Sequence, residues 1–304
     1  MPKYFVPTAR PAGVRAGRRA GDGYGATAQP DWRAIDWPSH LRRIEIDGTP
    51  VNYVDIGPTA PVPPGREPVV LVHGLGGQWQ NWLENIPRAA LERRVIAVDL
   101  PGFGLSPELD RAPTPQLLAG TVAALMDDLG LERAHVAGNS LGGWVALELA
   151  KAGRALSVAG LCTAGLWSKP IGPRRGRDVR AVGRKLMPVL PTLLRSSAGR
   201  QLVLRASVAH PERVPPEAAA RLVRSYVTSS GYESANVAMR SEVFSDFENV
   251  RVPVTLAWGD QDKLVSRPRE TVSDWRTIVL HGCGHIPTWD DPSQVARALL
   301  LASA

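Results

Sequence analysis

The pattern of hydrophobic and polar residues divides the chain into segments of different character. Residues 1–35 are rich in Gly, Ala, Pro and Arg and have hardly any periodic apolar pattern. Such a segment cannot bury enough apolar surface to offset the entropy of ordering it, so we expect a flexible basic arm. After Leu41, apolar and polar residues alternate over 43–47 and again over 51–55, which predicts a two-stranded hairpin.

Short runs that are apolar at nearly every position follow this hairpin. A strand that is apolar on both faces is typical of a parallel sheet covered by helices. Segments with helical periodicity lie between the runs, at 115–129 and 141–152, and after the last run, at 291–301. The alternation predicts an α/β fold with a doubly wound, mostly parallel sheet of about eight strands. The runs lie at 69–72, 95–98, 134–137, 158–161 and 254–257.

The alternation is interrupted once, between Trp167 and Phe247. Helix-like patterns occur in this stretch, but no convincing strand does. We therefore expect an α/β core over 36–165 and 246–304, with an all-helical cap inserted over 166–245. Ligands bind at the carboxyl ends of the strands in such sheets, so a cap there would shape the pocket. The helix-like patterns lie at 181–194, 198–209 and 217–227.

The net charge of +7 is distributed unevenly. Residues 1–33 carry six basic and two acidic side chains, and residues 164–245 carry fourteen basic and five acidic ones. No nucleic-acid motif with interleaved aromatic residues accompanies this charge, so we expect no nucleic-acid partner. The favoured interpretation is a solvated basic face, with contact to an anionic membrane surface as a weaker alternative.

The cytoplasm is the compartment expected for this chain, by default. No apolar run approaches the ~18 residues of a membrane-spanning helix, and no export signal is recognisable. The two cysteines, Cys162 and Cys283, give neither a disulfide framework nor a metal-ligand spacing. We expect them to be buried or partly buried thiols in a reducing compartment. The oligomeric state is left open.

A G-x-S-x-G sequence from Gly138 to Gly142 lies between a predicted strand, 134–137, and a predicted helix, 141–152. This context is typical of a nucleophile elbow, in which a tight turn exposes the serine and glycines let the strand and helix approach closely. The pentapeptide alone is a weak signal in a glycine-rich chain. The assignment of Ser140 as nucleophile therefore depends on finding a base and an acid.

A serine hydroxyl needs a general base, and the chain has six histidines. His285 lies in the glycine-containing loop 282–287, after a predicted strand over 277–280 and before the last helix. A loop at a strand end can hold an exposed side chain over the sheet, so we predict that His285 is the base, with His281 as a distant second. Of the remaining histidines, His40 and His210 are expected at the surface and His135 is expected to be structural. His73 opens a loop that is described below.

The base needs a carboxylate that orients it and stabilises its cation. Asp260 and Asp262 both follow the predicted strand 254–257. Aspartates are also common in turns for purely structural reasons, so we expect one of the two to be structural. We favour Asp262 as the catalytic acid. The order Ser140, Asp262, His285 is then the triad order of α/β hydrolases.

The oxyanion of a tetrahedral intermediate is commonly held by two backbone N–H groups. One is expected from Leu141, directly after the nucleophile, and the second from Leu75. Leu75 lies in a loop that follows the run 69–72, and His73, Gly74 and Gly76 are expected to support it. A phosphate-binding role for this loop is less favoured, because it lacks the Lys-Ser/Thr of a P-loop.

These motifs together resemble the α/β-hydrolase family, and they occur in family order over roughly residues 42–302. In the family pattern the last Asp of a W-G-x-x-D stretch is the acid, which supports Asp262 over Asp260. The resemblance implies no metal and no organic cofactor. The motifs are His73-Gly74, the stretch from Asp99 to Ser106, the Ser140 elbow, the stretch from Trp258 to Asp262, and Gly284-His285.

The leading hypothesis is hydrolysis of a carboxylic ester, with a small-molecule substrate and a lipid-like ester as one option. An apolar part of the cap, from Leu186 to Leu194, would suit an acyl chain, although packing against the core explains it equally well. The resemblance also leaves open carbon–carbon bond hydrolysis of a dienoic diketone acid, thioester hydrolysis, acyl transfer and perhydrolysis. A non-catalytic receptor or binding protein is the alternative from another class. Haloalkane dehalogenases and the related epoxide hydrolases use an Asp nucleophile, so Ser140 argues against both reactions.

Overall fold

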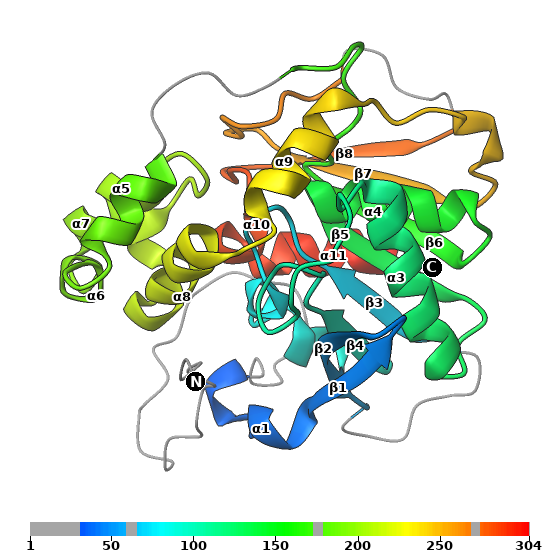
Figure 1. The fold of residues 1–304 in the computed structure, drawn as a ribbon, viewed down its shortest axis with the longest axis horizontal. Helices are drawn as coiled ribbons and strands as arrows, with labels where there is room; N and C mark the ends of the chain where they lie inside the picture. The colour runs from blue at the N-terminus through cyan, green and yellow to red at the C-terminus, as the bar shows by residue number, and fades with distance from the viewer. Residues whose placement is uncertain (1–30, 59–65, 173–178, 269–273, 304) are drawn as a thin grey trace.

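The computed structural model describes residues 31–58, 66–172, 179–268 and 274–303. Its centre is an eight-stranded sheet in the order β1-β2-β4-β3-β5-β6-β7-β8 (Figure 1). The β1–β2 and β2–β4 pairs are antiparallel, and all other neighbours are parallel. This arrangement confirms the predicted fold class. The strands are β1 Leu41–Ile46, β2 Thr49–Ile56, β3 Val69–Val72, β4 Val95–Val98, β5 Ala134–Asn139, β6 Ala155–Leu161, β7 Val254–Gly259 and β8 Arg276–Leu280.

Helices cover both faces of the sheet, because the central strands are apolar on both faces. Alternate residues of β3 belong to two different cores, with Val70 in one and Leu71 in the other. Figure 1 shows α3 and α4 on one side of the sheet and α11 on the other. None of the helices in the described ranges is long and apolar enough to cross a membrane. The core helices are α1 Trp37–His40, α2 Ile86–Ala89, α3 Pro115–Asp128, α4 Leu141–Lys151, α10 Pro287–Asp290 and α11 Pro292–Ala302.

The segment between β6 and β7, residues 162–253, is called the helical insertion below. Its described residues form helices and no strand. The helix expected over 181–194 is instead two helices, because Pro188 and Pro191 cannot donate the backbone hydrogen bonds that would continue the first. A helix over 232–241 was not predicted. The helices are α5 Val179–Leu186, α6 Leu190–Leu193, α7 Ser197–Leu204, α8 Pro216–Thr228 and α9 Tyr232–Ser241, with short 3₁₀ turns at Pro211–Arg213 and Phe247–Asn249.

The apolar residues expected to suit an acyl chain divide into two groups. Leu190 and Leu194 are buried in the core that also contains Leu222 and Val223 of α8. The group that faces solvent comprises Leu186, Val189 and Leu193. Packing between helices therefore accounts for the buried pair.

Residues at the start of the described chain pack against the core, which the sequence analysis does not expect. Residues 1–30 of the expected arm lie outside the described residues, but Trp32–Ala34 forms a 3₁₀ turn and the Trp32 side chain is buried. Its indole N–H donates to Glu84 Oε1 at 2.9 Å, and its ring meets Trp289 edge-on at 6.4 Å between centroids. Residues 31–35, which the sequence analysis assigned to the arm, thus belong to the folded part of the chain, because burying a large aromatic ring outweighs the cost of ordering a short turn.

Candidate active site

Ser140 lies at the turn between β5 and α4, in a backbone conformation that side chains rarely adopt. Its φ is 54° and its ψ is −116°. Such a conformation costs about 1–3 kcal/mol for a non-glycine residue and persists only where the surroundings enforce it. Small neighbours make it accessible, since a Cβ on Gly138 would collide with the backbone of Gly142, and one on Gly142 with the carbonyl of Val72. The predicted elbow is present.

His285 and Asp262 form a hydrogen-bonded pair at the carboxyl ends of β8 and β7. His285 Nδ1 lies 2.8 Å from Asp262 Oδ2, and the two side chains are only 9% and 2% exposed. The other carboxylate oxygen, Oδ1, accepts from the backbone N–H groups of Leu264 and Val265 at 2.8 and 3.0 Å. Burial raises the pKa of Asp262, but the hydrogen bonds to its carboxylate and the electrostatic interaction with His285 outweigh burial, and the pKa is lowered overall.

The alternative pair, His281 and Asp260, lies at the surface. The His281 side chain is 81% exposed and its Nδ1 is 3.3 Å from Asp260 Oδ2. Asp260 Oδ1 accepts the N–H of Gly282 at 2.8 Å, so its carboxylate joins the loop after β7 to the turn after β8. The two aspartates therefore have different partners. Asp262 contacts the buried His285, whereas Asp260 contacts the turn at Gly282, which precedes the His285 loop.

Asn139, immediately before the elbow, connects it to the loop of His285. Its side-chain amide Nδ2 donates to the carbonyl oxygen of His285 at 2.9 Å and to that of Leu161 at 3.1 Å. This contact brings the nucleophile and the base loop together. No hydrogen bond joins the Ser140 hydroxyl to the His285 ring within the described ranges, and such bonds often tighten only when substrate is bound. The sequence analysis missed this role of Asn139, because the G-x-S-x-G motif allows any residue at this position.

The loop from His73 to Gly77 lies against the elbow. A Cβ on Gly74 would be 3.1 Å from both Ser140 Cβ and the carbonyl oxygen of Asn139. Gly76 has a φ of 74°, and a Cβ there would meet the Tyr226 and Tyr232 rings of the helical insertion at 3.0 and 3.2 Å. The loop is therefore held between the elbow and the insertion, where only glycine backbone fits.

His73 fixes this loop from inside the protein. Its Nδ1 is 2.8 Å from the carbonyl oxygen of Gly74, and its Nε2 is 3.0 Å from the backbone nitrogen of Leu100. Since an N–H donates to Nε2, the ring is the neutral tautomer with its proton on Nδ1. Complete burial lowers the pKa of His73 to about 4, against a smaller opposing effect of the Gly74 carbonyl. His73 thus positions the loop and is not a proton carrier at neutral pH.

Two further buried acids organise the surroundings. The sequence analysis names Asp99 only as the start of a family motif, without a role, and does not name Asp290. Asp99, after β4, accepts hydrogen bonds from the backbone of Trp79 and Leu105 and from Asn52 Nδ2. The carboxylate of Asp290 accepts hydrogen bonds from the backbone N–H groups of Gly284, Ala209 and His210, at 2.7, 3.1 and 2.8 Å respectively. Asp290 therefore ties the base loop to the helical insertion.

Cys162 lies beside the histidine–aspartate pair. Donor atoms of Cys162, Asp262 and His285 all lie within 4.8 Å of one another. Burial, followed by the negative charge of Asp262, raises the pKa of the Cys162 thiol well above its usual range. Burial likewise raises the pKa of Cys283 to about 12. A protonated thiol is a poor metal ligand, and both carboxylate oxygens of Asp262 already accept hydrogen bonds, so this donor set fits a hydrogen-bonded cluster better than a metal site.

Known proteins resemble this chain in sequence over most of its length. It is 28% identical over 273 residues to the dihydrolipoyllysine-residue acetyltransferase component of the acetoin cleaving system of Pseudomonas putida, covering 85% of this chain and 68% of that protein. It is also 28% identical over 281 residues to 2-hydroxy-6-oxononadienedioate/2-hydroxy-6-oxononatrienedioate hydrolase 2 of Pseudomonas putida, covering 86% and 94%. A third relative, epoxide hydrolase EphH of Mycobacterium tuberculosis, is 29% identical over 60% of this chain and 92% of its own length.

Solved structures share the fold. The enol-lactonase from Burkholderia xenovorans LB400 superposes with a TM-score of 0.66 at 22% identity, covering 86% of this chain and 99% of that one. A thermophilic esterase from Thermogutta terrifontis superposes with a TM-score of 0.65 at 22% identity, covering 86% and 97%. The sequence profile of the Alpha/beta hydrolase family matches residues 69–298. Fold, elbow and family profile agree, and the chain belongs to the alpha/beta hydrolase family.

Proposed function

We propose that this protein is a serine hydrolase that cleaves a carboxylic ester through an acyl-enzyme. The observation that carries the proposal is the buried hydrogen bond between Asp262 and His285, in a loop that Asn139 holds against the Ser140 elbow. An aspartate that accepts from Nδ1 leaves Nε2 of the imidazole free to take a proton from a serine hydroxyl. Asp262 stays ionised for this role because its pKa is lowered.

In the proposed reaction, Ser140 Oγ attacks the ester carbonyl carbon while His285 takes the hydroxyl proton. The negative charge on the carbonyl oxygen is held by the backbone N–H groups of Leu141 and Leu75. In the described part of the chain, neither amide makes a turn, loop or cap hydrogen bond. His285 then gives the proton to the leaving alkoxide, and the bond between carbonyl carbon and alcohol oxygen breaks. Water, deprotonated by His285, attacks the acyl-enzyme and releases the carboxylic acid and Ser140.

A second candidate is hydrolysis of a carbon–carbon bond in a dienoic diketone acid. The observation that favours it is the name of the Pseudomonas putida relative, a 2-hydroxy-6-oxononadienedioate hydrolase, which aligns over 94% of its length. The same triad serves both reactions, because each requires attack on a carbonyl carbon. The name of the EphH relative suggests epoxide opening, but the serine at the elbow argues against that reaction for this chain.

The proposal is tested with purified protein and a series of chromogenic esters of increasing acyl length. We expect Ser140→Ala to lower the rate by about 10⁴-fold or more. A fluorophosphonate probe should add to Ser140, as mass spectrometry of the digested protein would show. A wild type that is inactive on every ester but cleaves a dienoic diketone acid would favour the second candidate. No turnover of either class and no labelling at Ser140 would leave a binding role.

A further inference from the structure

The helical insertion exposes aliphatic side chains along α5 and α6, and these residues are called the apolar stripe below. They recur every third or fourth residue, which is the spacing of one face of a helix. The spacing continues through the turn between the helices, where the N–H of Val189 donates to the carbonyl oxygen of Leu186 at 3.0 Å. Contiguous exposed apolar patches are uncommon on soluble proteins and mark contact sites. The apolar stripe comprises Val179, Val182, Leu186, Val189 and Leu193, whose exposed fractions lie between 37% and 56%.

The opposite side of α5 and α6 is packed against α8. Arg180 of α5 is buried, and its guanidinium donates to the carbonyl oxygen of Ser229 at 2.6 Å. A Cβ on Gly183 would lie 2.7 Å from Val227 Cγ2, so the backbone of α5 lies directly on α8. The two buried leucines of α6 fix the second helix in the same way. The apolar stripe is therefore the outward side of two firmly held helices.

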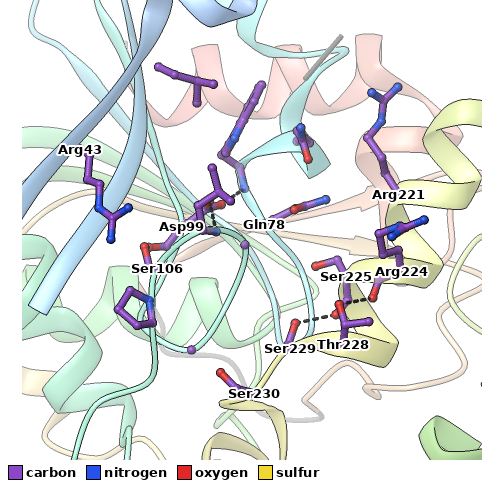
Figure 2. Close-up of a pocket in the computed structure, with 17 residues that line it drawn as sticks. Arg43, Gln78, Asp99, Ser106, Arg221, Arg224, Ser225, Thr228, Ser229 and Ser230 are labelled. Carbon is purple, nitrogen blue, oxygen red and sulfur yellow. Dashed lines mark hydrogen bonds between the residues drawn. The ribbon is translucent and has the colours of Figure 1, made fainter. Parts of the chain in front are cut away.

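The side of α8 that faces the core is polar. An arginine-lined cavity of about 420 Å³ lies between the second half of α8, strand β1 and the loops that follow β3 and β4. Figure 2 shows Arg43 on one wall, with Arg221 and Arg224 on the wall of α8. The hydroxyl groups of Ser225 and Thr228 also lie on this wall. The insertion thus directs polar groups toward the cavity and aliphatic groups outward, which fits an apolar neighbour outside the chain.

The sequence around the apolar stripe is basic. Residues 179–205 contain six basic residues and no acidic or aromatic residue. Two of the six, Arg180 and Arg200, are buried and donate to backbone carbonyl oxygens. Lys185 is exposed, next to Leu186 in sequence and one helical turn after Val182, so a cation borders the stripe. Exposed basic residues of this stretch include Lys185, Arg195 and Arg205.

The chemistry of this surface favours a lipid over a protein as its neighbour. A symmetric contact with a second copy would bring the basic groups of both stripes together, and like charges repel. Protein interfaces depend mainly on aromatic anchors, and residues 179–205 have none. Aliphatic side chains bordered by lysine and arginine are typical of helices that lie in the surface of an anionic membrane.

We propose that the apolar stripe of α5 and α6 docks on the surface of an anionic lipid membrane. The aliphatic side chains enter the boundary between headgroups and acyl chains, and Lys185 and Arg195 pair with acidic headgroups. Figure 1 shows α5, α6 and α7 at the outer end of the insertion, with α8 between them and the sheet. The proposal does not depend on the proposed function, because lipid binding is measured without turnover.

Co-sedimentation of the full chain with sucrose-loaded vesicles tests the proposal. One set of vesicles contains phosphatidylcholine and phosphatidylglycerol in equal parts, and the other contains phosphatidylcholine alone. We expect saturable binding to the mixed vesicles that weakens as salt is added, because exposed charges are screened. Binding to phosphatidylcholine alone should be at least several-fold weaker, since the attraction of the cations is lost.

Substitutions separate the apolar contribution from the charge. Leu186→Gln and Val189→Gln should each lower the partition coefficient about fivefold, as expected for side chains that are about half exposed before docking. Lys185→Gln should lower it about fivefold on the mixed vesicles only. Leu301→Gln is the matched apolar control, since Leu301 of α11 is 47% exposed and Leu186 is 46% exposed. Arg251→Gln removes an exposed charge outside the insertion helices, and both controls should stay within about twofold of the wild type.

Three outcomes would overturn the proposal. The first is that the chain fails to bind the mixed vesicles, or that Leu186→Gln binds them as the wild type does. The second is a lower sedimentation coefficient of Leu186→Gln without lipid, which would assign the stripe to a contact between copies of the chain. The third is capture of the wild type, but not of Leu186→Gln, by immobilised polyglutamate with no binding to vesicles, which would assign the stripe to an acidic protein.

Discussion

The side-chain amide of Asn139 donates to the backbone carbonyl oxygen of His285 at 2.9 Å, across 146 positions of sequence. The residue before the nucleophile therefore fixes the height of the base loop over the sheet. This contact is a backbone anchor for His285, whereas Asp262 orients its ring. The two interactions act on different parts of the same residue, so they can be separated by substitution.

Asn139→Ala should lower kcat about 10- to 100-fold, because the base loop loses its anchor and a misplacement of the order of 1 Å is costly for catalysis. KM should change much less. Asn85→Ala is the matched control, since the buried Asn85 also donates its side-chain amide to a distant carbonyl, that of Pro292 at 3.0 Å. Steady-state kinetics on the best ester compare the two. Equal losses of kcat in both variants would attribute the effect to general destabilisation.

The two aspartates after β7 should differ sharply in their effect on rate. Asp262→Asn removes the charge that stabilises the protonated His285 and is expected to lower kcat about 10³- to 10⁴-fold. Asp260→Asn should change kcat by less than about threefold, because Asp260 contacts the exposed His281 and the backbone N–H of Gly282. Activity measured at equal concentrations of folded protein distinguishes them. If Asp260→Asn were the more damaging of the two, the assignment of the acid would have to be exchanged.

Asp290 should couple the base loop to the helical insertion. The carboxylate of Asp290 only accepts hydrogen bonds, whereas the amide that Asp290→Asn introduces would also carry N–H donors. At least one of the three backbone N–H groups then loses its acceptor. The expected cost is about 1–3 kcal/mol in the free energy of unfolding. Hydrogen exchange at Gly284, Ala209 and His210 should accelerate together. Asp291→Asn is the control, because Asp291 accepts from Ser293 and Gln294 at the start of α11.

In that control variant, exchange at Gly284 and Ala209 should remain slow while the start of α11 loosens. Independent exchange of the base loop and the insertion in Asp290→Asn would contradict the coupling.

The buried His73 should make the protein less stable in acid. Its pKa is about 4 in the folded chain and 6.5 when unfolded, so between these values the unfolded state binds more protons. The stability contributed by neutral His73 is therefore fully present above pH 6.5 and is lost as the pH falls toward 4. The loss amounts to about 3 kcal/mol in the free energy of unfolding. Urea unfolding at pH 7 and pH 4 measures it.

His73→Gln should be less stable than the wild type at pH 7, and the difference should shrink toward pH 4. His135, whose pKa burial also lowers to about 4, is present in both proteins and cancels in this comparison. His40→Gln should follow the pH profile of the wild type. A constant difference between wild type and His73→Gln across the pH range would show that His73 does not titrate on unfolding.

The sequence was most informative where local patterns determine the structure. The runs at 69–72 and 95–98 match β3 and β4 in full, because strands buried on both faces have a distinctive composition. The elbow was predictable since its glycines, strand and helix are consecutive in the chain. The expected Ser140, Asp262 and His285 are brought to one end of the sheet, with Asp262 and His285 in direct contact.

Contacts between distant segments were not predictable. The roles of Asn139, Asp290 and Asp99 depend on which backbone groups meet them after folding, and polar residues with these roles resemble any loop residue in the sequence. The sequence analysis assigned Trp32 to a flexible arm, because a single aromatic residue among glycines and prolines shows no periodicity. In the structure its ring packs edge-on against the ring of Trp289, which is distant in sequence. The cavity beneath α8 combines residues of β1, two loops and a helix, so no local pattern marks it.

The burial of both native thiols has a practical consequence for spectroscopy. Cys162 and Cys283 are inaccessible, and burial raises the pKa of each, so at neutral pH they react slowly with maleimide reagents. A cysteine introduced at an exposed position would then be labelled selectively in an otherwise unmodified chain. Arg224→Cys on α8 would place a fluorophore at the rim of the arginine-lined cavity, where its emission reports directly on the approach of the helical insertion to the core.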